Sequence, residues 1–197
     1  MPSPIIIPQV WPDRIKDLAG QPANITARIA LGLFRHGLMS SREVLNYTAE
    51  LEERFPSEPN PLLGQTIYGA YFPINNPITS HIVEGNNYKV GEEIDFAVKI
   101  ADQEFILTPK VPITSAEQIR ITYHKRYYVQ VQVGDRFQAG INFSGGHLHL
   151  DYIDKKPGEH YIVNPLEDLI KSLGFEKPEH FFQMWPENFK GKIVTWV

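Results

Sequence analysis

The sequence predicts an α+β fold: a small β-barrel with C-terminal helices and an N-terminal helical hairpin. Three observations support this. Short stretches rich in β-branched and aromatic residues, each ended by turn residues, follow one another through the middle of the chain. Two helical patterns precede them, and two more lie near the C-terminus. Many short strands with helices at the ends are typical of a barrel and not of a doubly wound sheet.

The segment from Asn164 to Val197 carries the clearest local signals. Its first residue can cap a helix, a proline suits the next position, and apolar residues at helical spacing follow until Gly174 ends the helix. A second short helix is expected to begin at Pro178. Asn188 to Gly191 is expected to turn the chain, and Lys192 to Val197 has the composition of a closing strand.

Residues 1–23 are predicted to form an extended N-terminal arm, because prolines at short intervals exclude a helix up to Pro12. The arm carries Ile5, Ile6, Ile7 and Trp11, which would be an association liability if they were exposed. Two interpretations stay open. The arm lies over its own domain, or it docks on a protein partner or on a second copy of the chain.

Residues 24–64 are predicted to form a helical hairpin and a linker. Asn24 can cap the first helix, which Gly37 closes, and Ser40 with Glu43 forms a capping-box pattern for the second. A DNA-binding helix-turn-helix would give the same pattern. The second helix is rich in glutamate, however, and acidic side chains repel phosphate, so we favour a hairpin that packs on the domain.

Residues 65–197 are predicted to form the β-rich domain. Valines and glutamines alternate from Tyr128 to Val133, Gly134-Asp135 is a two-residue hairpin signal, and apolar residues alternate again on the return strand. The other expected strands are Thr66 to Phe72, Glu93 to Lys99, Glu104 to Thr108, Gln118 to Tyr123 and His147 to Ile153.

Composition limits the classes of function. The chain has 197 residues, 42% of them hydrophobic, so it can build a sizeable core. It contains no cysteine, which excludes disulfides and thiolate metal sites. The net charge of -4 gives no global attraction to nucleic acid, although a local basic patch is compatible with it. No apolar run suits a membrane span or a secretory signal. We therefore expect a cytoplasmic protein without membrane contact, or a virion protein if its origin is viral.

One basic and aromatic cluster is a candidate nucleic-acid surface. Cations bind phosphates and aromatic rings stack on bases, so an RNA or single-strand site would use such a cluster. A hairpin end with solvated charges would give the same composition. The candidate residues are Lys89, His124, Lys125, Arg126, Tyr127 and Tyr128.

His147, His149 and Asp151 occupy alternate positions and share one face of the expected strand. Two imidazoles and a carboxylate could hold a divalent metal. We prefer the interpretation of a solvated strand face, because strand spacing alone is a weak metal signal. The sequence contains no phosphate-binding glycine loop and no nucleophile elbow. We therefore predict no cofactor, no metal and no catalytic residue, and the classification leans away from an enzyme.

Several segments, in this order, resemble the ASCH domains of the PUA-like β-barrel superfamily. The resemblance implies a barrel with a cleft that relatives use for RNA, nucleotides or modified bases. The matching segments are Thr79 to Val83, Tyr88 to Phe96, Thr114 to Ile121, Val131 to Arg136 and Leu173 to Trp196.

The family motif at the first of these strands has a glycine, a lysine and an arginine, and Asn75 to Glu84 has none of them. The resemblance therefore implies a non-catalytic binding module, for RNA or another nucleic acid. The alternative is a structural or assembly protein, such as a phage virion component, that uses the barrel as a scaffold and the arm for docking.

Overall fold

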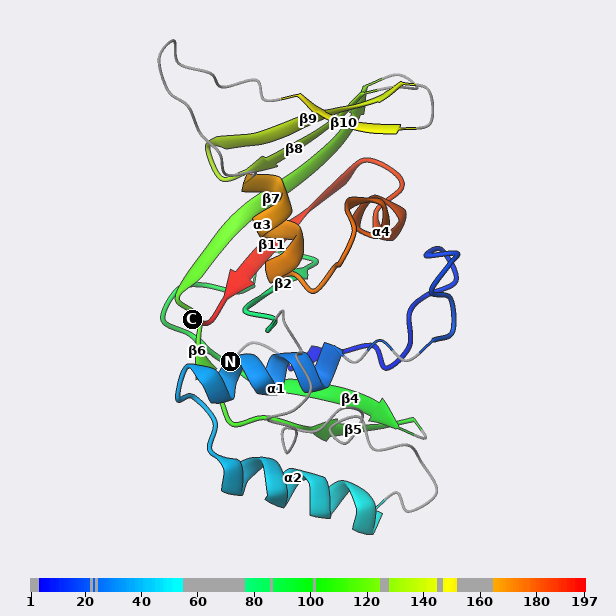
Figure 1. Ribbon diagram of the computed structural model, residues 1–197. Helices are drawn as coiled ribbons and strands as arrows, with labels where there is room; N and C mark the ends of the chain where they lie inside the picture. Colours follow the sequence, from blue (N-terminus) through cyan, green and yellow to red (C-terminus); the bar gives the residue numbers. More distant parts are fainter. Residues whose placement is uncertain are drawn as a thin grey trace.

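The computed structural model describes residues 4–21, 23, 25–54, 77–85, 87–100, 102–124, 128–144, 147–151 and 165–197, which form helices and strands (Figure 1). The helices are α1 (Ile25–Arg35), α2 (Ser41–Arg54), α3 (Pro165–Ser172) and α4 (Pro178–Met184). The strands are β1 (Ile5–Ile6), β2 (Ser80–Val83), β3 (Glu93–Ile94), β4 (Phe96–Ile100), β5 (Gln103–Ile106), β6 (Val111–Pro112), β7 (Ser115–His124), β8 (Tyr128–Val133), β9 (Arg136–Ser144), β10 (His147–Asp151) and β11 (Phe189–Thr195).

The largest sheet has six strands in the order β10-β9-β8-β7-β11-β2, and every neighbouring pair is antiparallel. The hairpin between β8 and β9 turns at Gly134, whose φ is 57°, as the sequence predicts. Because β11 pairs with β7 on one side and with β2 on the other, the last strand of the chain lies inside the sheet.

The turn predicted from Asn188 to Gly191 is wrong, because β11 already begins at Phe189. The chain turns before that residue, where the Asn188 side chain accepts a hydrogen bond of 2.8 Å from the backbone N–H of Tyr123. Gly191 then lies within the strand. A Cβ atom there would come within 2.7 Å of the Phe189 ring and 2.8 Å of the carbonyl oxygen of Val83. Only glycine allows the ring and the neighbouring strand to approach this closely.

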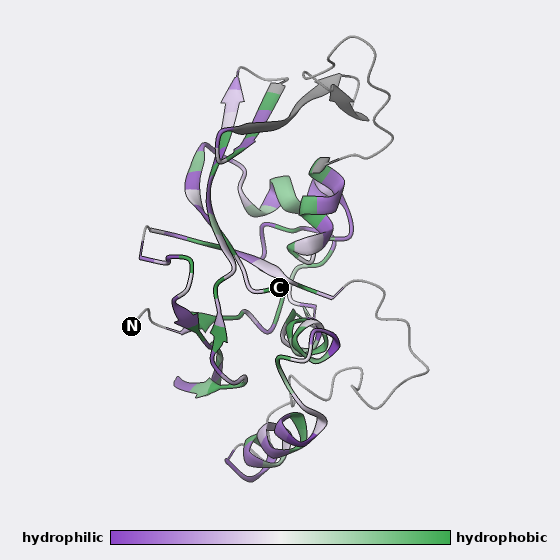
Figure 2. Ribbon diagram, turned by 90° about the vertical axis from the view of Figure 1, so that its left-hand side faces the viewer, coloured by the Kyte–Doolittle hydropathy of each residue, from purple (hydrophilic) through white to green (hydrophobic). Residues whose placement is uncertain are grey.

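Helices α3 and α4 lie on the same side of the six-stranded sheet (Figures 1 and 2). Gly174 ends the α3 segment with a φ of 93°, as predicted. Aromatic rings then fill the space between α4 and the sheet. Phe181 is fully buried, and its ring centroid lies 5.1 Å from that of Trp185, which in turn lies 5.5 Å from Phe189 of β11. The ring of Phe181 is thereby removed from water, and those of Trp185 and Phe189 are partly removed from it.

A second layer consists of the three-stranded sheet β1-β4-β5 with α1 and α2, and β3 and β6 form a separate pair (Figure 1). The two layers share one hydrophobic core. At their junction, Phe96 of β4 and Trp196 pack edge to face with ring centroids 4.7 Å apart. The fold is therefore mixed α+β, as predicted. The strand pairings among the described residues give open sheets and no closed barrel.

The N-terminal arm packs on its own chain, which is one of the two alternatives left open by the sequence. Its strand β1 pairs in parallel with β4, opposite Phe96. Ile5, Ile7 and Trp11 are 4%, 1% and 8% exposed. The Trp11 ring centroid lies 5.7 Å from that of Phe175. Ile5, Ile7 and Trp11 therefore contribute to the shared core, whereas Ile6 is 41% exposed.

The predicted capping box of α2 is present. The backbone N–H of Ser40 donates to the Glu43 carboxylate over 2.7 Å, and the backbone N–H of Glu43 donates to the Ser40 hydroxyl over 3.2 Å. The caps expected at Asn24 and Asn164 and the strand expected from Thr66 to Phe72 lie outside the described residues. None of the described helices has the length and apolar character that crossing a bilayer requires.

Candidate nucleic-acid interface

The six-stranded sheet has two faces of different character. Along β7, Ile119 and Ile121 are buried, and Tyr123 on the same face donates a hydrogen bond of 2.6 Å to the carbonyl oxygen of Trp185 at the end of α4. Arg120 between the two isoleucines points the other way and is exposed. Figure 2 shows the corresponding alternation of hydrophobic and hydrophilic positions along the strands. We call the side away from these helices the outer face. In β2, β7, β8 and β11 it comprises His81, Val83, Ala116, Gln118, Arg120, Thr122, His124, Gln130, Gln132, Lys190, Lys192 and Val194.

Two cations lie directly opposite each other on the outer face. Lys190 of β11 pairs with Arg120 of β7, and Arg120 pairs in turn with Gln132 of β8. Two positions along β11, Lys192 pairs with Gln118. Arg120 and Lys190 are exposed. The sheet therefore holds three cationic side chains side by side on two adjacent strands.

We call Arg120 and Lys190 the cationic pair. No nearby described group compensates their charges. Within the described part of the chain, neither residue forms an ion pair or a side-chain hydrogen bond. The outer-face positions of β2, β7, β8 and β11 include no aspartate or glutamate. Like charges directly opposite each other destabilise an antiparallel pair. The cationic pair is therefore an electrostatic cost to the fold and a ready site for an anion.

One end of the outer face lies beside the segment that follows β2. The Lys192 ammonium donates a hydrogen bond of 2.7 Å to the carbonyl oxygen of Tyr88, and the next residue, Lys89, is exposed. Val83 and His81 of β2 are the outer-face positions nearest this end, and burial lowers the pKa of His81 to about 4. The face is therefore apolar and neutral along β2 and becomes cationic at β11.

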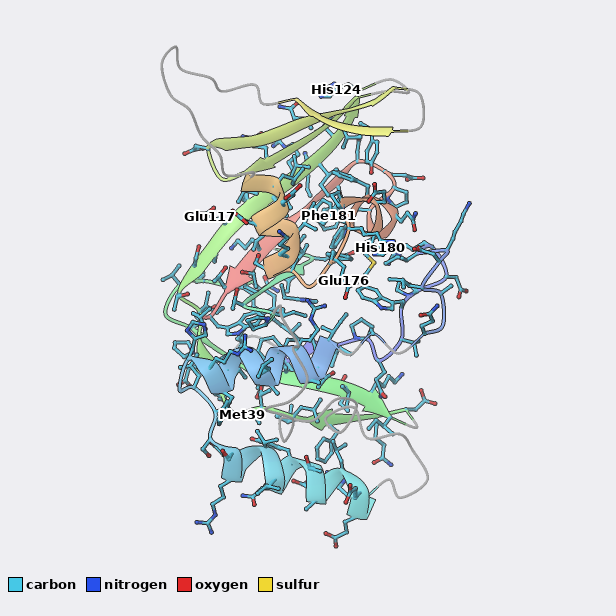
Figure 3. The ribbon with its side chains drawn as sticks, viewed as in Figure 1. Met39, Glu117, His124, Glu176, His180 and Phe181 are labelled. Atoms are coloured by element: carbon cyan, nitrogen blue, oxygen red, sulfur yellow. The ribbon has the colours of Figure 1, made fainter. Side chains whose placement is uncertain are left out.

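The opposite end of the outer face is marked by His124, which Figure 3 shows at the end of the sheet far from α1 and α2. Its imidazole Nε2 lies 2.9 Å from the side-chain oxygen of Gln130. The backbone of Tyr128 pairs with that of His124. Lys125, Arg126 and Tyr127 lie outside the described residues, so their place in the predicted surface stays a prediction.

The structure thus places Lys89 and His124 at opposite ends of one face and not in one cluster. Lys192, which reaches the residue before Lys89, is opposite Gln118, and the distance from Gln118 to His124 along β7 is roughly 20 Å at ~3.3 Å per residue. Between these ends lies the cationic pair, which the sequence analysis did not select. Alternation of polar residues in β7 is a signal for Arg120, whereas the composition around Lys190 predicts a turn.

Strand β10 carries the residues considered for a metal site. Its backbone pairs with β9, with His149 opposite Asn142 and Asp151 opposite Gly140. The side chains of β10 lie outside the described part of the structure, and among the side chains that it describes, no group of three or more His, Asp or Glu could hold a metal ion. The preference for a solvated strand face stays a prediction.

A second polar contact lies on the side of the sheet that carries α3 and α4, and it joins the N-terminal arm to α4. The buried imidazole of His180 on α4 lies 3.0 Å from the carboxylate of the half-exposed Asp17 (Figure 3 shows His180). This hydrogen bond lowers the pKa of Asp17. One residue earlier, the backbone N–H of Lys16 donates to the Gln183 side chain over 3.2 Å. Both contacts fix the arm on α4, and we assign them a structural role.

Comparison of the chain with protein-family models, with curated proteins and with solved structures gave no match.

Proposed function

We propose that this protein is a non-catalytic module that binds nucleic acid through the outer face of its six-stranded sheet. The observation that carries the proposal is the cationic pair: Arg120 and Lys190 are exposed, lie directly opposite each other and have no carboxylate partner among the outer-face positions of β2, β7, β8 and β11. A polyanion that neutralises both side chains relieves their mutual repulsion and releases its own counterions.

The rest of the face suits the same class of ligand. Lys192 extends the positive charge along β11, and exposed Lys89 lies just beyond it. Because the whole chain carries a net charge of -4, the attraction is local and directs a polyanion to this one side. The resemblance to ASCH domains implies the same ligand class, and the PUA-like barrel that it implies stays a prediction.

The test is a binding series with a fluorescently labelled single-stranded RNA at increasing salt, starting at ~50 mM, where phosphate contacts are strongest. The substitutions Arg120→Gln and Lys190→Gln are introduced together. Each phosphate contact contributes ~0.7 to the slope of log affinity against log salt for a single strand. The double variant is therefore expected to reduce the slope by about 1.4 and to weaken binding at low salt.

A matched control is Lys171→Gln. Lys171 is on α3, on the helix side of the sheet, and its ammonium lies 4.0 Å from the Glu167 carboxylate. Its removal should leave affinity and slope unchanged. Absence of binding by the unmodified protein at ~50 mM salt would exclude the proposed function. An equal effect of the control and the double variant would show that the outer face is not the binding surface.

The alternative function, an assembly or virion protein with a docking arm, has less support. Its main argument is an arm whose apolar residues need a partner to cover them. Ile5, Ile7 and Trp11 are buried in their own chain, and of the four residues only Ile6, which is 41% exposed, is left on the surface.

A further inference from the structure

We infer that the ligand of the outer face is a single strand of nucleic acid and not a duplex, with phosphates on the cationic pair and base edges on the neutral residues of β7 and β8. This inference rests on the proposed function and specifies its ligand. It follows from how charged and neutral polar residues are distributed over the face, and from the width of the sheet.

Charge and neutral polarity are on separate parts of the face. The positive side chains of the central strands are Arg120, Lys190 and Lys192, all at the boundary of β7 and β11. Beside them, Gln132 pairs with Arg120, and one row further along the strands Thr122 pairs with Gln130. Amides and hydroxyls both donate and accept hydrogen bonds, so they can read base edges, whereas cations bind phosphates.

Phosphate spacing fits this arrangement. Lys190 and Lys192 alternate with an inward residue on β11, so they lie ~6.8 Å apart along the strand. A strand that runs parallel to β11 can therefore place one phosphate between Arg120 and Lys190 and the next toward Lys192, whose ammonium already donates to the carbonyl oxygen of Tyr88. Its bases would then project across β7 toward β8, where Gln132 continues the row of the cationic pair and Thr122 and Gln130 form the next row.

A duplex cannot place its base edges on the same surface. Six strands at ~4.8 Å spacing make a sheet roughly 24 Å wide, whereas the major groove of B-DNA is only ~12 Å wide and that of an A-form RNA duplex is deep and narrow. The face is too broad to enter the groove, so a duplex would contact the cations through its backbone and leave the neutral residues without bases. In an unpaired strand the bases can be splayed onto the sheet.

The experiment compares a labelled RNA of about 15 nucleotides of mixed sequence with the duplex that it forms with its complement, both at ~50 mM salt. We expect the single strand to bind about tenfold or more tightly than the duplex. If the duplex binds equally or more tightly, and Arg120→Gln with Lys190→Gln still weakens it, the inference is wrong and the proposed function stands. If neither probe binds, the proposed function is wrong.

A second pair of substitutions tests the contacts with bases. Thr122→Val with Gln130→Ala removes neutral hydrogen-bonding groups and no charge. We expect this variant to bind the single strand about fivefold or more weakly, which corresponds to the loss of about one hydrogen bond. The slope of log affinity against log salt should not change, because no charge is removed. Thermal melting of the variant verifies its folding. A folded variant with unchanged affinity would overturn the assignment of base edges to β7 and β8.

Discussion

The guanidinium of Arg28 in α1 donates a hydrogen bond of 2.6 Å to the carbonyl oxygen of Gly174, at the residue that ends the α3 segment. Arg28 is 8% exposed, and the loss of solvent around it lowers its pKa, an effect that the charge of Glu176 opposes. A cation beside the C-terminal end of a helix is favoured by the helix dipole. The contact therefore joins the N-terminal helices to the C-terminal half of the chain.

We predict that Arg28→Leu lowers the free energy of unfolding by about 2 kcal/mol, because the buried carbonyl oxygen of Gly174 loses a charged donor. Urea denaturation followed by circular dichroism measures this. Arg35→Leu is the matched control, since Arg35 is on the same helix and is exposed. Equal losses of unfolding free energy in the two variants would show that the Arg28 hydrogen bond does not stabilise the fold.

We predict that His81 makes stability fall in mild acid. Its pKa is lowered to about 4 in the folded protein and is 6.5 in the unfolded chain, so the unfolded chain binds a proton between these values that the folded protein does not. The contribution is complete above pH 6.5 and is lost as the pH falls toward 4. The pKa difference sets an upper bound of about 3 kcal/mol on the loss of unfolding free energy. The real loss is smaller, because the side chain is partly exposed and water screens its charge.

The measurement is the free energy of unfolding of the unmodified protein and of His81→Gln at pH 7 and pH 5. The variant should lose less stability between these two values than the unmodified protein. His36→Gln, at an exposed position, should behave like the unmodified protein. A difference between the unmodified protein and His81→Gln that does not change with pH would contradict the prediction.

We predict that the N-terminal arm stabilises the chain to which it belongs. Trp11→Ala removes a buried ring that contacts Phe175, and should lower the free energy of unfolding by about 3 kcal/mol. A chain that starts at Asp13 should be less stable still and should keep the oligomeric state of the full chain. Light scattering after size exclusion measures that state. A change of oligomeric state on truncation would support the assembly alternative instead.

We predict that the protein purified without chelator contains no stoichiometric metal held by His147, His149 and Asp151. Elemental analysis of the unmodified protein and of His147→Ala tests this. Zinc, manganese or iron at one equivalent, lost in the variant, would contradict the prediction and would make an enzyme a serious candidate.

Elements whose sequence signals are local could be predicted from the sequence. The capping box of Ser40 and Glu43 and the turn at Gly134 depend on residues a few positions apart, and both were predicted. The start of β11 was not predicted, because Gly191 and its neighbours have the composition of a turn. Only the pairing with β7 and β2, which are distant in the sequence, makes this segment a strand.

The candidate site shows the same limit. His124 and Lys89 were selected as members of basic and aromatic stretches, which are visible along the chain. The cationic pair is not visible in this way, because Arg120 and Lys190 come from strands whose pairing is a long-range contact. Alternation assigns a residue to a face of its own strand, but the neighbour across the sheet depends on topology and register.

The position of β11 also has a consequence for synthesis on the ribosome. Ser80 of β2 and Thr195 of β11, whose hydroxyls lie 2.9 Å apart, are separated by 115 positions. At about 5–20 residues per second, β2 waits roughly 6–23 s before its partner has been translated. Until then β2 and β7 both present open edges, which are templates for wrong pairing. The six-stranded sheet is therefore completed only after translation of β11, and a nascent chain that ends before Phe189 should depend on chaperones to stay unaggregated.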